Sequence, residues 1–88
     1  MEYFVYILEC KDKTLYIGYT NNLEKRVLSH NNLKSGAKYT KGRRPVVLVY
    51  FENYKTKSES LKREIILKKM TRTEKIDLIK KAGGLPPA

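Results

Sequence analysis

The chain has 88 residues, with 19 Lys and Arg against nine Asp and Glu and a formal net charge of +10. A chain of this length forms one small domain with a thin core. The single cysteine, Cys10, excludes an internal disulfide and a cysteine-rich zinc site and favours a reducing compartment. The N-terminal apolar run is too short for a signal peptide or a membrane span, so we expect a soluble cytoplasmic protein.

The positive charge is concentrated in the second part of the sequence. Residues 1–33 hold four basic and four acidic side chains, whereas residues 34–88 hold fifteen basic and five acidic ones. A polyanion is the natural partner of such a segment, because each neutralised phosphate releases counterions. We therefore expect a nucleic acid partner, DNA before RNA. The alternatives are a basic helical surface that meets only solvent, or one that docks on an acidic protein.

Two apolar runs, 3–8 and 15–20, are rich in aromatic and β-branched residues and flank a polar segment. This pattern predicts an antiparallel hairpin. With the turn centred on Lys11, Tyr6 lies directly opposite Tyr16. Side chains alternate along a strand, so both phenols are expected on one face of the sheet.

The same register places Phe4 opposite Gly18. A glycine weakens a strand, and the close approach of a ligand backbone or phosphate is one reason for having it there. Gly18 is therefore a candidate substrate-binding position. The opposite face of the hairpin is expected to form core from Val5, Ile7, Leu15 and Ile17.

A short helix is predicted after the hairpin. It begins at Asn21, an N-cap residue with a glutamate three positions later, as in a capping box. Leu23 and Val27 are four residues apart and would face the sheet. Arg26 and His30 have the same spacing on a second stripe, which can point at the tyrosine face.

Residues 31–44 have neither a helical nor a strand period and contain Asn, Ser and two Gly, which predicts a loop. The loop is longer than most in compact domains, so a functional role is expected, with an ordinary solvent-exposed loop as the alternative. Basic residues interleaved with an aromatic one suit contact with a phosphate backbone. The side chains expected to contact substrate are Lys38, Tyr39, Thr40, Arg43 and Arg44.

The unbroken apolar run at residues 46–51 predicts a third strand that is buried on both faces. A T-x-x-E signal at Thr56 then opens a helix to about Lys69. The residues expected near its core stripe are Leu61, Ile65 and Met70.

A second T-x-x-E signal at Thr71 opens a last helix to Lys81 or Ala82, with Ile76 and Ile79 facing inward. Two glycines stop it. The prediction is an α+β fold with a small, mostly antiparallel three-stranded sheet flanked by helices, in the order β-β-α-β-α-α. We expect one domain over residues 1–82 and a C-terminal tail over residues 83–88.

Several sequence blocks stand in a fixed order between about Tyr3 and Met70. They are Val5-Tyr6-Ile7, Tyr16-Ile17-Gly18, Asn22 to Arg26 with His30, Gly36 to Thr40, Arg44-Pro45 and Glu64. In this order the chain resembles the GIY-YIG nuclease domain, most of all its small stand-alone YhbQ-like members. The first motif departs from the family pattern, since it begins Phe4-Val5 in place of Gly-Ile and keeps the tyrosine. Some family nucleases also carry an asparagine about a dozen residues after the metal-binding glutamate, and residues 73–80 contain none.

The resemblance implies a role for each candidate catalytic residue. It places the metal-binding glutamate at Glu64, which would hold Mg²⁺ or Mn²⁺; hard cations take carboxylate oxygens and commonly keep most of their waters. Arg26 would bind the scissile phosphate through two hydrogen bonds from its planar guanidinium group. Tyr6 is expected to act as the base and Tyr16 to orient water or phosphate, with His30 accepting the phenolic proton of Tyr6. From the residues alone, a glutamate with Lys68 four residues on is more typical of a solvated ion pair, and surface arginines are common. Strand tyrosines usually pack, and a histidine near a helix end usually caps the helix or interacts with its dipole.

The resemblance and the charge pattern together predict a metal-dependent endonuclease that hydrolyses phosphodiester bonds in DNA. A domain this small has few residues for base readout, so low sequence specificity is expected, with a partner protein as one source of specificity and with DNA repair or recombination as the setting. The alternative is a nucleic-acid-binding module with weak or no catalysis, acting on RNA.

Overall fold

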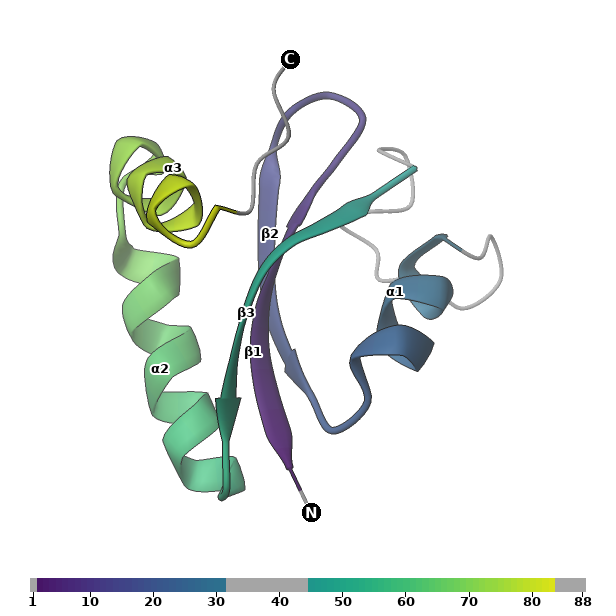
Figure 1. Cartoon of the computed structure of the whole chain (residues 1–88), viewed down its shortest axis with the longest axis vertical. Helices are drawn as coiled ribbons and strands as arrows, with labels where there is room; N and C mark the ends of the chain where they lie inside the picture. Colours follow the sequence, from purple (N-terminus) through teal and green to yellow (C-terminus); the bar gives the residue numbers. More distant parts are fainter. Residues whose placement is uncertain (1, 32–44, 84–88) are drawn as a thin grey trace.

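A computed structural model of the chain describes residues 2–31 and 45–83. The order of its elements is the predicted β-β-α-β-α-α, which confirms the α+β fold (Figure 1). The elements are β1 (Tyr3–Glu9), β2 (Leu15–Thr20), α1 (Leu23–Asn31), β3 (Val47–Tyr54), α2 (Lys57–Lys69) and α3 (Arg72–Lys81).

The three strands form one antiparallel sheet in the order β2-β1-β3, and helices lie on both of its faces (Figure 1). β1 is the central strand, and four consecutive residues of it, Val5 to Leu8, are fully buried. The face toward α2 and α3 forms a core of Val5, Ile7, Ile17, Val49, Leu67 and Ile79. The face toward α1 forms a second cluster of Tyr6, Leu8, Cys10 and Val46, against which Tyr16, Leu23, Val27 and Leu48 pack.

The observed hairpin register differs from the predicted one by two residues. Tyr6 lies opposite Gly18, Phe4 lies opposite Thr20, and the turn is centred on Asp12 rather than Lys11. The Asp12 carboxylate accepts hydrogen bonds from the backbone N–H and the hydroxyl of Thr14, and these bonds stabilise a turn centred on Asp12. A shift of two residues keeps every side chain on its predicted face. The prediction that both phenols share a face is therefore confirmed, whereas the direct pairing of Tyr6 with Tyr16 is wrong.

The third strand was expected to be buried on both faces, and this expectation is wrong. β3 runs to Tyr54, three residues beyond the predicted end, and Val47 and Phe51 are 54% and 52% exposed. β3 is an edge strand, and on the α1 side the apolar cluster reaches Leu48 but does not include Phe51. An unbroken apolar run therefore marks a strand that is only partly covered.

The helix starts follow the capping signals with one change. Thr56 and Thr71 are the N-caps of α2 and α3, as predicted. In α1 the cap is Asn22 rather than Asn21, because the Asn22 side chain accepts the backbone N–H of Lys25. Asn31, which was assigned to the predicted loop, is the last residue of α1, and residues 32–44 lie outside the described part of the chain.

The core face of α2 lies partly on other residues than expected. Ile65 is 54% exposed, whereas Ser60 and Leu67 are fully buried against the sheet. The small Ser60 side chain lets the helix approach the strands closely. α3 ends as predicted before Gly83, which has a φ of +71°. None of the helices in the described residues is long and apolar enough to cross a membrane.

Candidate active site

The Tyr6 hydroxyl is the centre of a buried chain of polar groups. Tyr6 Oη lies 3.0 Å from His30 Nε2, and Arg26 Nε donates a hydrogen bond to the same oxygen over 3.2 Å. Tyr6 and His30 are almost completely buried, at 0% and 1% exposure. The strand β1 supplies the phenol, and one stripe of α1 supplies both partners, as their spacing of four residues predicts.

Tyr16 completes the aromatic part of this cluster from β2. Its ring centroid lies 4.9 Å from that of His30 in an edge-to-face arrangement and 6.5 Å from that of Tyr6. Such pairs stabilise a fixed ring geometry beyond the area that they bury. Tyr16 is only half-buried, so of the two phenols it is the one nearer to solvent.

Gly18 has an intramolecular reason to be a glycine. A Cβ atom added at this position would lie 2.4 Å from Tyr6 Oη and 2.7 Å from Tyr6 Cζ. The ring of Tyr6 therefore passes directly over the Gly18 backbone toward Arg26. The close approach inferred from the sequence is real, but the group that approaches is Tyr6, and a role for Gly18 in binding substrate stays a prediction.

Burial and the positive charge of Arg26 shift the pKa of Tyr6 in opposite directions. Burial raises the pKa of Tyr6 above its ordinary 10.0, the hydrogen bond and positive charge of Arg26 lower it, and Tyr16 and Glu64 add smaller increases. The net pKa is raised, so the phenol is protonated at neutral pH. The hydrogen bond to Tyr6 raises the pKa of Arg26 despite its partial burial, so the guanidinium remains charged.

Glu64 lies on α2 and acts on Tyr6 through its charge. Its side chain is 14% exposed and lies 3.4 Å from Lys68 Nζ, and its negative charge is one of those that raise the pKa of Tyr6. The described residues contain no group of three His, Cys, Asp or Glu that could hold a metal ion together. One carboxylate fits a hard cation that keeps most of its water ligands, and it does not fit a metal that needs several protein ligands.

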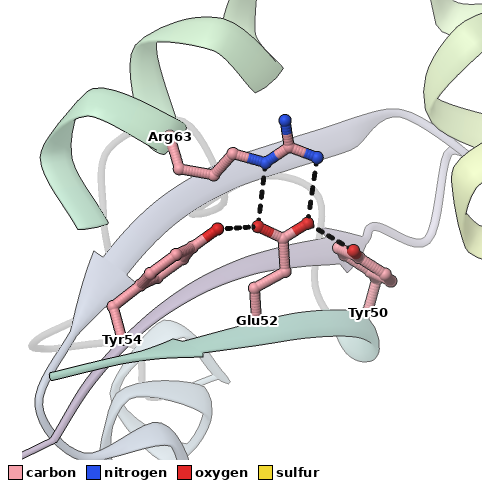
Figure 2. A network of polar contacts seen from close by, with 4 residues as sticks. All are labelled: Tyr50, Glu52, Tyr54 and Arg63. Atoms are coloured by element: carbon pink, nitrogen blue, oxygen red, sulfur yellow. Dashed lines mark hydrogen bonds and ion pairs between the residues drawn. The ribbon is translucent and has the colours of Figure 1, made fainter. Parts of the chain in front are cut away.

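The helix that carries Glu64 is tied to β3 by a network that the sequence analysis missed (Figure 2). Arg63 Nε donates to Glu52 Oε1 over 2.8 Å and Arg63 Nη2 donates to Glu52 Oε2 over 3.1 Å. The hydroxyls of Tyr50 and Tyr54 donate to the same carboxylate. Burial alone would raise the pKa of Glu52, but these three donors outweigh it and the pKa is lowered.

This network fixes the rotation of α2 beside Glu64. A bidentate pair between a guanidinium and a carboxylate has a defined geometry, and Arg63 directly precedes Glu64 in the helix. The signal was present in the sequence, because Tyr50, Glu52 and Tyr54 alternate and must share one face of a strand. The partner Arg63 is eleven residues from Glu52 and has no local signature.

The structure thus brings together Tyr6, Tyr16, Arg26 and His30, with Glu64 close enough to act on Tyr6 electrostatically. Gly18 lies directly beneath Tyr6. The other predicted substrate contacts lie outside the described residues, and they are Lys38, Tyr39, Thr40, Arg43 and Arg44.

Comparison with known proteins identifies the family of the chain. The model of the GIY-YIG catalytic domain matches residues 2–77, and the chain belongs to this family. The family is one of nucleases, which implies a nucleic acid substrate.

Within the family, the chain is similar to proteins named UPF0213. A UPF0213 protein of Clostridium perfringens is 59% identical over 76 residues, which are 86% of this chain and 81% of that protein. One of Syntrophus aciditrophicus is 61% identical over 77 residues, 88% of each chain. The solution NMR structure of a UPF0213 protein from Bacillus halodurans has a TM-score of 0.62 at 42% identity and covers 96% of this chain and 88% of that one. An NMR structure of a protein from E. faecalis has a TM-score of 0.64 at 34% identity and covers 100% of this chain and 93% of that one.

Proposed function

We propose that this protein is a divalent-metal-dependent endonuclease that hydrolyses phosphodiester bonds in DNA with little sequence preference. The observation that carries the proposal is the chain from Arg26 Nε through Tyr6 Oη to His30 Nε2, with both distances near 3 Å. It links Arg26, a cation suited to bind phosphate, to the phenol of Tyr6, and it links that phenol to His30, which can accept its proton. A role in DNA repair or recombination is part of the same proposal.

The direction of proton transfer follows from the donors in the chain. The N–H of Arg26 Nε can only donate, so it occupies a lone pair of Tyr6 Oη and leaves the hydroxyl hydrogen for His30. His30 accepts it at Nε2 in the tautomer that carries its hydrogen on Nδ1. As this proton passes to His30, Tyr6 Oη takes a proton from the attacking water, so the phenol, whose pKa is raised, activates the water without forming a free phenolate beforehand.

The remaining groups supply charge and position. The Arg26 fork binds an oxygen of the scissile phosphate beside Tyr6, and Tyr16 orients the water or the phosphate from β2. Glu64 would hold Mg²⁺ or Mn²⁺, which supplies positive charge that stabilises the phosphate in the transition state. Arg63 and Glu52 keep the helix of Glu64 in place.

Cleavage assays with branched and duplex DNA in Mg²⁺ and in Mn²⁺ test the proposal. We expect Glu64→Gln, Arg26→Ala and Tyr6→Phe each to lower cleavage at least about 100-fold, the effect of removing one preorganised group. Asp77→Asn on α3 is the matched control and should cleave as the wild type does, because Asp77 is exposed and outside the site. Identical product patterns from wild type and Glu64→Gln would refute the enzymatic function.

A binding module with weak or no catalysis, acting on RNA, is the second candidate. The observation in its favour is the complete burial of Tyr6 together with its raised pKa, which keeps the phenol protonated and covered. This function predicts salt-sensitive binding that survives Tyr6→Phe and Glu64→Gln, and no cleavage with any divalent ion. Cleavage that depends on both residues would exclude it.

A further inference from the structure

Two hollows meet at the residues that join β2 to α1. The larger has a volume of about 430 Å³ and is lined by Tyr3, Tyr19, Thr20, Asn21, Arg26 and Lys57. The smaller has a volume of about 240 Å³, shares Thr20, Asn21 and Arg26 with the first, and adds Asn22, Lys25 and Ser29. Because they share three residues, the two hollows adjoin, and we call them together the polar groove.

The polar groove gathers elements that are distant in the sequence. Figure 1 shows the end of β2, the start of α1 and the first turn of α2 at the same end of the molecule. Lys57 comes from that first turn, and its ammonium group lies 5.9 Å from the ring centroid of Tyr19. Three elements therefore contribute to one surface.

The chemistry of the polar groove matches a sugar-phosphate backbone. Its lining carries three cations, Lys25, Arg26 and Lys57, together with hydroxyl and amide groups, and none of the described lining residues is a carboxylate. Lys13, Lys68 and Lys81 elsewhere on the described surface each lie beside an acid, namely Glu9, Glu64 and Asp77. Cations, hydroxyls and amides are the groups that proteins use to bind phosphate and sugar oxygens, whereas base readout needs a side chain in a groove of the nucleic acid.

Arg26 connects the polar groove to the buried chain. The same side chain donates to Tyr6 Oη and lines both hollows. A phosphate that Arg26 holds beside Tyr6 therefore has the polar groove next to it, where the adjoining nucleotides of the same strand would lie.

We propose that the polar groove binds the backbone of the nucleic acid strand that flanks the phosphate at Arg26, with Lys25 and Lys57 as phosphate contacts. The proposal rests on the proposed function for the identity of the ligand. It adds a binding surface within the described residues, separate from the predicted contacts at residues 38–44.

Fluorescence anisotropy with a short labelled DNA, single-stranded and duplex, tests the proposal. The buffer contains EDTA, so binding is measured without cleavage, and the salt concentration is varied. Lys25→Gln and Lys57→Gln should each weaken binding about fivefold at 0.1 M salt and lower the salt slope by about 0.7 for single strands and about 0.9 for duplex, the loss of one phosphate contact. Both side chains are exposed, so the variants are expected to fold.

Lys13→Gln and Lys80→Gln remove the same charge outside the polar groove and are the matched controls. They should leave the salt slope within error of the wild type. If the groove and control variants change DNA affinity and the salt slope equally, the proposal that the polar groove binds the strand is wrong. It is also wrong if the wild type does not bind DNA. These results are separate from the test of catalysis, because a protein that cleaves normally can fail here, and one that never cleaves can still bind through Lys25 and Lys57.

Discussion

The substitution Gly18→Ala tests the arrangement of the candidate active site with a single methyl group. The new Cβ would lie 2.4 Å from Tyr6 Oη, where an ordinary van der Waals contact begins at 3.4 Å. Tyr6 is completely buried and bonded at its tip to Arg26 and His30, so its ring cannot move away from Gly18 without disturbing these contacts. The tip of the ring must shift by about 1 Å.

The size of the effect follows from that displacement. Overpacking a buried position costs about 1–3 kcal/mol, and a domain of this size loses roughly 4–8 °C in Tm for each kcal/mol. A misplacement of about 1 Å in a reacting group lowers the rate about 100-fold. We therefore expect Gly18→Ala to melt roughly 10 °C below the wild type and to lose about two orders of magnitude in DNA cleavage.

Thermal unfolding by circular dichroism and the cleavage assay measure the two effects. Gly83→Ala is the control for cleavage: no atom lies within 4 Å of a Cβ added there, so it should cleave as the wild type does, and any loss of stability comes from its φ of +71°. Tyr6→Phe removes the atom of the closest contact, so Gly18→Ala should cost less stability in a Tyr6→Phe background, by at least about 0.5 kcal/mol. If Gly18→Ala is as stable and active as the wild type, or if the two substitutions are additive, the reasoning fails.

Three further predictions concern the scaffold around the site. Glu52→Gln should lower the free energy of unfolding by about 2 kcal/mol at pH 7, because its partner guanidinium loses a partly buried carboxylate. The pKa of Glu52 is lowered, so its contribution is present above about pH 4.5 and is lost as the pH falls through the lowered value. Burial, then the hydrogen bond and charge of Glu52, raise the pKa of Tyr50 and Tyr54 to about 12, so their contribution is complete below pH 10 and is lost toward pH 12. Urea unfolding across pH should show the wild-type free energy of unfolding falling both below about pH 4.5 and above pH 10, with a smaller loss at low pH in Glu52→Gln. The same pH dependence in both proteins would contradict the assignment. Asn31→Ala should cost about 1–3 kcal/mol, because the Asn31 amide makes two hydrogen bonds to the backbone of the residue that precedes β3; an unchanged urea midpoint would show that this link is dispensable. Thr71→Ala removes the capping box of α3 and should cost about 1 kcal/mol, seen as a lower Tm, with Thr71→Ser largely restoring it.

The sequence by itself determined the order of the elements and the starts of the last two helices. The starts of α2 and α3 were predictable because each capping signal lies within four residues, as in Thr71 and Glu74. The shared face of Tyr6 and Tyr16 was predictable because alternation along a strand survives a register shift of two. The stripe of Arg26 and His30 followed from helical spacing alone.

Tertiary structure decided what these residues touch. The reason for Gly18 is the ring of Tyr6 above it, which depends on the register that Asp12 sets in the turn. The polar groove exists because Lys57 comes to lie beside the end of β2. Local periodicity specifies the direction of a side chain from its own strand or helix, but a contact across elements also needs their relative placement. The packing of helices on the two faces of the sheet determines that placement, and no short segment of the chain contains it.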